Sequence, residues 1–161
     1  MPAEEYDRPL KPWLATAYPE RAFARVISSR DKRSIHVLIV EDDHAIADMY
    51  ETQLQHDGYR VTVAGTALVG LELIRSSTPD VVLLDVLLPD RSGFELMMML
   101  HETGVGPPPI VILSNYGEPG MIRQGMSLGA VEYLVKSRVT PAEVSRSIPG
   151  WIEQSRGPAK N

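Results

Sequence analysis

The feature that most constrains the fold is a regular alternation, from Ile35 onward, of short apolar runs with longer amphipathic segments. Short runs of mostly aliphatic residues are typical of strands that are buried on both faces of a sheet. The predicted strands are Ile35–Val40, an edge-like Arg60–Ala64, Val81–Leu84, Ile110–Leu113 and Val131–Val135. Strands that alternate with helices predict right-handed crossovers and a doubly wound parallel sheet, an α/β fold with helices on both faces.

The segments between these strands have apolar residues at helical spacing. The predicted helices are His44–Gln55, Thr66–Ser76, Phe94–His101, Met121–Leu128 and one that begins at Thr140-Pro141. Thr66 is predicted to be an N-cap, and Asp57-Gly58 is predicted to end the first helix. The fourth helix is expected to be short or mobile, because each interior glycine costs roughly 0.5–1 kcal/mol of helix stability.

The last helix contains a helix breaker. Pro149-Gly150 predicts an early end to this helix, because proline has no amide hydrogen and clashes with the preceding turn. Trp151-Ile152 would then form a separate turn, and we expect Trp151 to pack back on the domain.

The two ends of the chain do not follow the alternation. Residues 1–34 are interrupted by four prolines and are predicted to be an N-terminal extension, flexible or arm-like, with one short helix over 19–27. One domain is expected over 35–154, which is an ordinary domain size, followed by a tail over 155–161.

Composition excludes several classes of protein. The chain has no cysteine, so it has no disulfide, no cysteine nucleophile and no thiolate metal site. It has neither a signal-peptide pattern nor an apolar run of the roughly 18 residues that a membrane span needs, which predicts a cytoplasmic protein without membrane insertion. Residues 35–161 carry nine Lys and Arg against sixteen Asp and Glu. Such an acidic body disfavours direct binding of nucleic acid but can hold a divalent cation.

Polar residues follow four of the predicted strands. They are Glu41, Asp42 and Asp43 after the first strand, Asp85 after the third, Ser114 after the fourth and Lys136 after the fifth. Ligands of doubly wound sheets bind beyond the carboxyl ends of the strands, so we expect these side chains at one rim. Asp42 and Asp85, with Glu41 directly or through water, would make an all-oxygen site for Mg²⁺ or Mn²⁺. Asp43 is interpreted as a helix N-cap.

The same residue types fit phosphoryl transfer. A carboxylate such as that of Asp85 can act as a nucleophile and form an acyl-phosphate. Mg²⁺ and Lys136 would neutralise the phosphoryl charge, and the hydroxyl of Ser114 would bind a third oxygen.

Four ordered motifs resemble the receiver domain of bacterial two-component response regulators. They are Val40-Glu41-Asp42-Asp43, Leu84-Asp85-Val86-Leu87-Leu88-Pro89 with Gly93, Ile112-Leu113-Ser114, and Gly129-Ala130-Val131-Glu132-Tyr133-Leu134-Val135-Lys136. The resemblance runs over about 35–154 and implies a flavodoxin-like sheet with strand order 2-1-3-4-5. It implies a phosphoprotein of phosphorelay signalling rather than an enzyme. The short tail favours the single-domain type, without an output domain.

The resemblance implies specific roles. Asp85 would be the phosphoacceptor, receiving phosphate from a sensor histidine kinase or a histidine phosphotransfer protein. Glu41, Asp42, Asp85 and the backbone carbonyl of Leu87 would hold Mg²⁺, and Lys136 would pair with the phosphoryl oxygens.

A switch is implied as well. The hydroxyl of Ser114 would move onto the phosphate while the ring of Tyr133 turns inward. A surface formed by helix four, strand five and helix five would then change its contacts with a downstream protein. The resemblance leaves open whether the chain forms a homodimer.

Two positions depart from the family pattern, and two more bear on the phosphate lifetime. Ser137 follows Lys136 where the family usually has proline, and a cis bond there is disfavoured because it costs ~3 kcal/mol without proline. Asn115 is larger than the usual residue after Ser114 and could narrow the entrance to the site. Leu87 and Tyr116 offer no group that orients a hydrolytic water, which predicts slow autodephosphorylation.

Three other functions are weighed against the receiver. A pseudo-receiver would use the same fold as an interaction module without phosphorylation, and Asn115 and Ser137 are the residues that favour it. An aspartyl-phosphate phosphohydrolase typically has a second aspartate two residues after the nucleophile, where this chain has Leu87. A dinucleotide oxidoreductase would need a glycine-rich loop after the first strand, where this chain has acidic residues.

Overall fold

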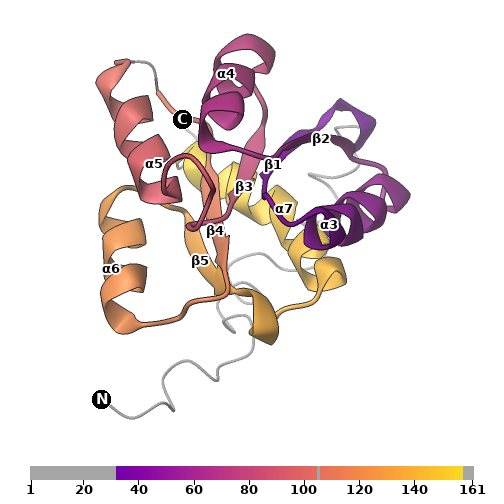
Figure 1. Ribbon diagram of the computed structural model, residues 1–161. Coiled ribbons are helices and arrows are strands. Elements are labelled where there is room, and N and C mark those ends of the chain that lie inside the picture. The colour runs from indigo at the N-terminus through magenta and orange to yellow at the C-terminus, as the bar shows by residue number, and fades with distance from the viewer. Residues whose placement is uncertain (1–31, 105, 158–161) are drawn as a thin grey trace.

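A five-stranded parallel sheet forms the centre of the protein (Figure 1). The computed structural model describes residues 32–104 and 106–157. The strands are β1 (His36–Val40), β2 (Arg60–Ala64), β3 (Val81–Leu84), β4 (Ile110–Ser114) and β5 (Glu132–Val135). They lie in the order β2-β1-β3-β4-β5, and every neighbouring pair is parallel. The predicted doubly wound fold and its strand order 2-1-3-4-5 are therefore confirmed.

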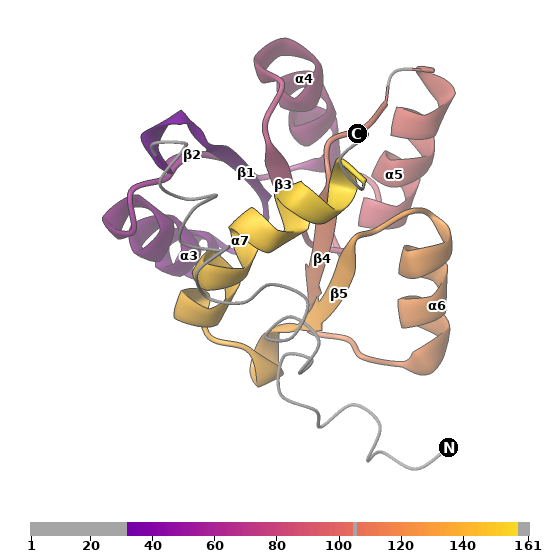
Figure 2. The same cartoon turned by 180° about the vertical axis from the view of Figure 1, so that it is seen from behind.

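Helices cover both faces of this sheet (Figures 1 and 2). They are α3 (His44–His56), α4 (Ala67–Ser77), α5 (Gly93–Glu102), α6 (Pro119–Ser127) and α7 (Pro141–Ser155), with short 3₁₀ turns η2 (Lys32–Ser34) and η3 (Lys136–Arg138). Helix α6 has nine residues and is short, as predicted. In these described ranges, none of the helices has the length and apolarity needed to cross a membrane. The helix predicted over 19–27 lies outside the described residues.

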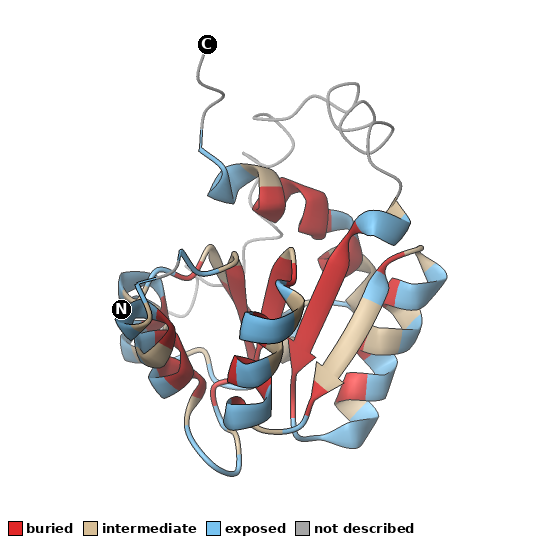
Figure 3. Ribbon diagram, turned by 90° about the horizontal axis from the view of Figure 1, so that it is seen from above, coloured by how far each residue is buried: buried red, intermediate tan, exposed pale blue. Residues whose placement is uncertain are grey.

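The sheet separates two hydrophobic cores. Helices α4 and α5 pack with one face of the sheet, and α6 contributes partly buried residues there, whereas α3 and α7 pack on the other face. Every residue of β1, β3 and β4 is buried, while the edge strands β2 and β5 are partly accessible. Figure 3 shows this pattern, with exposed residues on the outer sides of the helices. The fully apolar runs of the sequence are thus the strands that have helices on both sides.

The caps predicted from the sequence start the helices as expected. Asp43 accepts hydrogen bonds from the amides of Ala45 and Ile46, and Thr66 accepts one from Val69. Thr140 caps α7 in a reciprocal arrangement with Glu143. Side-chain oxygens at these positions satisfy amides that have no partner within the helix.

The early end predicted for the last helix is wrong. Helix α7 continues through Pro149 to Ser155. Proline at position 149 leaves the carbonyl of Ser145 without its usual partner four residues later. The hydroxyl of Tyr59 donates a hydrogen bond to that carbonyl at 3.0 Å. A side chain from beside β2 therefore replaces the missing bond, and Trp151 stays in the helix, where it is 1% exposed.

This replacement predicts a measurable loss of stability. Tyr59→Phe should lower the free energy of unfolding by about 1–3 kcal/mol, because the buried carbonyl of Ser145 loses its partner. Tyr50→Phe is a matched control, since Tyr50 is equally buried and its hydroxyl bonds none of the described residues. In a Pro149→Ala background, where an amide is restored, Tyr59→Phe should cost clearly less. Urea denaturation gives the free energy of unfolding of the wild type, Tyr59→Phe, Tyr50→Phe, Pro149→Ala and the double variant. An equal loss of this free energy on Tyr59→Phe in both backgrounds would contradict the explanation.

Candidate functional site

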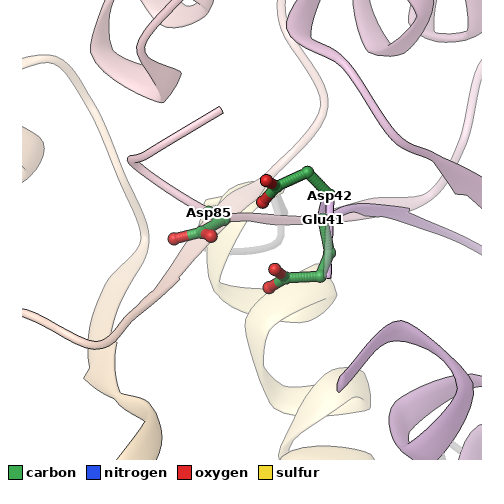
Figure 4. A group of neighbouring side chains, drawn as sticks. All are labelled: Glu41, Asp42 and Asp85. Atoms are coloured by element: carbon green, nitrogen blue, oxygen red, sulfur yellow. The ribbon is translucent and has the colours of Figure 1, made fainter. Parts of the chain in front are cut away.

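Three carboxylates gather at the carboxyl edge of the sheet (Figure 4). Strands β1 and β3 are neighbours in register, with Val40 opposite Leu84, so Glu41 and Asp85 follow adjacent strand ends. Glu41, Asp42 and Asp85 each place one oxygen within 4.8 Å of the others. Glu41 and Asp85 are 6% and 7% exposed, whereas Asp42 is open to solvent. The rim predicted from the strand ends is therefore a compact acidic group.

A lysine from the far edge of the sheet reaches this group. Lys136 directly follows β5, and its Nζ donates hydrogen bonds to Glu41 and, at 3.3 Å, to Oδ2 of Asp85. All three side chains are less than one-tenth exposed. Burial raises the pKa of Glu41, the Lys136 ammonium lowers it, and the charge of Asp85 raises it, with a net result above the ordinary value. The ammonium thus offsets part of the repulsion between the carboxylates.

The loop after Asp85 packs tightly against the start of α5. A Cβ atom on Gly93 would lie 2.3 Å from the carbonyl oxygen of Asp85, so only glycine fits there. The amide of Gly93 donates to the carbonyl of Val86 at 2.7 Å. Leu87 lies in this loop, two residues after Asp85, with its side chain half exposed. Close packing at Gly93 holds the chain next to the acidic group in one position.

Ser114 and Tyr133 bond the same backbone segment. Ser114 ends β4, is fully buried, and accepts a hydrogen bond from the amide of Tyr116 at 3.1 Å. Tyr133 pairs with Ile112 in the neighbouring strand, and its hydroxyl donates to the carbonyl of Tyr116 at 2.6 Å. Burial raises the pKa of Tyr133, which keeps the hydroxyl protonated as a donor. The two residues predicted as a switch pair therefore meet at Tyr116.

The positions that depart from the family pattern lie around this rim. Asn115 is exposed beside the buried Ser114. Ser137 lies in η3, and the part of the chain that the structure describes has no cis peptide bond.

The sequence pattern predicts no role for Asp90. The carboxylate of Asp90 accepts hydrogen bonds from the amides of Ala67 and Leu68, 23 and 22 residues away. An aspartate in a loop carries no sequence signal for so remote a partner. The only hint is that the first turn of α4 has no acidic residue of its own.

The donor set fits a hard divalent cation. Glu41, Asp42 and Asp85 provide oxygen ligands alone, and the exposed Asp42 leaves one side of the group open to water. Mg²⁺ prefers few carboxylates and keeps several waters, which matches this arrangement. The acidic pocket can therefore bind Mg²⁺.

A parallel sheet in this order with a polar carboxyl edge defines a doubly wound, flavodoxin-like α/β domain. The family model for the response regulator receiver domain matches residues 37–147. The chain belongs to the response regulator receiver domain family.

Similar proteins of known sequence come from several bacteria. The uncharacterized transcriptional regulatory protein YkoG of Bacillus subtilis is 35% identical over 101 residues, which cover 63% of this chain and 44% of that protein. The transcriptional regulatory protein AfsQ1 of Streptomyces coelicolor is 36% identical over 100 residues, which cover 62% of this chain and 44% of AfsQ1. The chain thus matches less than half the length of these relatives.

Solved structures are similar over about three quarters of this chain. A CheY-like response regulator receiver domain protein from Methanospirillum hungatei has a TM-score of 0.69 at 30% identity, covering 76% of this chain and 96% of that one. The BeF3-activated N-terminal receiver domain of RstA from Klebsiella pneumoniae has a TM-score of 0.68 at 27% identity, covering 74% and 99%.

Because Lys136 bonds both Glu41 and Asp85, its removal should change how the pocket responds to Mg²⁺. Lys136→Met leaves two buried carboxylates without their ammonium partner, so the free energy of unfolding in EDTA should fall by about 3 kcal/mol. Added Mg²⁺ should then stabilise this variant more than it stabilises the wild type. Arg123→Met, at an exposed position of α6, is the control and should respond to Mg²⁺ as the wild type does. Urea denaturation with and without Mg²⁺ decides the point, and equal Mg²⁺ effects in all three proteins would refute it.

Proposed function

We propose that Asp85 is the phosphoacceptor of a two-component phosphorelay and receives its phosphoryl group from a sensor histidine kinase or a histidine phosphotransfer protein. One observation carries the proposal: the buried Asp85 carboxylate has the Lys136 ammonium 3.3 Å away and lies within 4.8 Å of a carboxylate oxygen of both Glu41 and Asp42. A nucleophile, a fixed cation and a site for a second cation are thus present together. Phosphoryl transfer depends mainly on such positioning and charge neutralisation.

The chemistry follows from these positions. A carboxylate oxygen of Asp85 attacks phosphorus while the phosphorus–nitrogen bond of the donor histidine breaks. Glu41, Asp42, Asp85 and the backbone carbonyl of Leu87 would hold Mg²⁺, which supplies positive charge to the phosphoryl oxygens when it is bound. Lys136 exchanges its bond with Glu41 for one to a phosphoryl oxygen.

The switch pair would then transmit the change. Ser114 gives up its bond with the amide of Tyr116 to donate its hydroxyl hydrogen to the phosphoryl group. The ring of Tyr133 is buried and its hydroxyl donates to the carbonyl of Tyr116, which supports its role as the partner of Ser114 in the switch. The output surface would be formed by α6, β5 and α7, which follow the site along the chain.

The wider setting is also proposed. The domain comprises 35–154, with 1–34 as an extension and 155–161 as a tail. The downstream partner is a protein rather than nucleic acid, since residues 35–161 carry sixteen acidic against nine basic residues. The chain acts in the cytoplasm as a signalling phosphoprotein, not as an enzyme that turns over a substrate.

Incubation with Mg²⁺ and acetyl phosphate tests the phosphoacceptor. Intact mass should show one phosphoryl adduct on the wild type, none on Asp85→Asn, and one on the control Asp48→Asn, which changes an exposed aspartate of α3. An adduct that survives Asp85→Asn would refute the assignment. A wild type that binds no Mg²⁺ and forms no adduct would favour the pseudo-receiver instead.

The side chain of Leu87 predicts a slow loss of the phosphoryl group. Leu87→Asn places an amide two residues after Asp85, where it can orient an attacking water. One added hydrogen bond of about 1.4 kcal/mol in the transition state shortens the lifetime roughly tenfold. Met98→Asn changes a similarly exposed apolar residue on α5 and should leave the lifetime unchanged. Decay of the adduct by intact mass measures both, and identical lifetimes would contradict the prediction.

A further inference from the structure

A carboxylate in the active-site loop caps a different helix. Asp90 lies five residues after Asp85, in the loop between β3 and α5. Its Oδ1 accepts a hydrogen bond from the amide of Ala67 and its Oδ2 one from Leu68, both at 2.9 Å. The loop that carries the nucleophile is thereby bonded to the N-terminus of α4.

Two different side chains share the capping of α4. Thr66 is the N-cap and bonds the amide of Val69, while its carbonyl accepts from Gly70. The amides of Ala67 and Leu68 are left to Asp90. Partial desolvation raises the pKa of Asp90, but these amide bonds outweigh it and hold the pKa below its ordinary value. A charged carboxylate at this end of the helix also interacts favourably with the helix dipole.

Helix α4 rests on the strand that carries the acidic pair. A Cβ atom on Gly70 would lie 2.9 Å from a side-chain carbon of Val40, so the helix contacts β1 closely. Val40 is the last residue of β1 and directly precedes Glu41. The contacts therefore run from the acidic pair through Val40 and α4 to Asp90 and its loop.

The bonds of Asp90 reach further than the others of this loop. Beyond Asp85, the hydrogen bonds of the described loop are local: Gly93 bonds Val86, and Ser92 forms a capping box with Glu95. Asp90 alone among these connects the loop to another helix. The packing at Gly93 and the buried Val86 hold the two ends of this segment, so loss of the Asp90 bonds would loosen the part between them, around Leu87.

We infer that Asp90 is a positioning residue, which holds the Leu87 carbonyl at a fixed place relative to Glu41, Asp42 and Asp85. The inference rests on the proposed function, because it assigns the Leu87 carbonyl to the Mg²⁺ site. A loop that is already ordered binds the cation without the entropy cost of ordering it. Residues that orient metal ligands in this way typically change metal affinity by 10–100-fold.

The test compares two caps of the same helix. Asp90→Ala removes the remote cap and frees the loop, whereas Thr66→Ala removes the local cap and leaves the loop attached. Both variants lose capping of α4, so both should destabilise this helix. Asp90→Asn keeps one acceptor oxygen and is the conservative variant. Calorimetric titration with Mg²⁺, phosphorylation by acetyl phosphate over a Mg²⁺ series, and amide hydrogen exchange of residues 86–92 are the three measurements.

Asp90→Ala should weaken Mg²⁺ binding about tenfold. The Mg²⁺ concentration for half-maximal phosphorylation should rise to the same extent, while the rate at saturating Mg²⁺ recovers. Amide exchange over 86–92 should quicken. The Mg²⁺ affinity of Asp90→Asn should lie between that of Asp90→Ala and that of the wild type. Thr66→Ala should retain both the Mg²⁺ affinity and the slow amide exchange of the wild-type loop.

Three other outcomes would overturn the positioning role of Asp90, and a fourth would refute the proposed function. Wild-type Mg²⁺ affinity in Asp90→Ala, or unchanged exchange over 86–92, overturns the positioning role. An equal loss in Thr66→Ala also overturns it, because the effect would then come from the stability of α4. A wild type that binds Mg²⁺ with the expected dependence on Asp90 but accepts no phosphoryl group refutes the proposed function and leaves the positioning role standing.

Discussion

The ammonium of Lys136 is the interaction on which the site depends. It lies between Glu41 and Asp85, two buried carboxylates that follow neighbouring strands and that would repel each other without it. Lys136 follows the edge strand β5, so the ion cluster joins the carboxyl ends of three strands, β1, β3 and β5. Under the proposed function the same ammonium would compete with Mg²⁺ for these oxygens, so the charge that stabilises the pocket would also set how readily it accepts a cation or a phosphoryl group.

Ser114 and Tyr133 show how a change at this cluster can travel outward. Both bond the backbone of Tyr116, one to its amide and the other to its carbonyl. Movement of the Ser114 hydroxyl toward Asp85 would therefore release one side of a residue that Tyr133 holds on the other. Hydrogen bonds of defined direction join the loop before α6 to Ser114 and Tyr133, which gives the proposed switch a physical path to the output surface.

Local patterns made most of the fold predictable. All five strands begin and end within one residue of their predicted bounds. The central strands are almost continuous apolar runs because they are buried on both faces, and the edge strand β2 shows the alternation of a partly accessible strand. The gathering of Glu41, Asp42, Asp85 and Lys136 at one edge was predictable because parallel strands have their carboxyl ends at the same edge of the sheet. Pro149 and Asp90 were not predictable in the same way, since their effects depend on Tyr59 and on the first turn of α4. Contacts between residues so far apart leave no trace in local spacing.

A crystal structure with Mg²⁺ and beryllium fluoride, an analogue of the phosphoryl group, tests the central claim most directly. The account predicts beryllium fluoride on the carboxylate of Asp85, with the cation held by Glu41, Asp42, Asp85 and the Leu87 carbonyl. It predicts that Lys136 has left Glu41 for a fluorine atom and that Ser114 has left the amide of Tyr116. The account would be contradicted by a complex in which Asp85 carries no adduct and Lys136 still bonds Glu41.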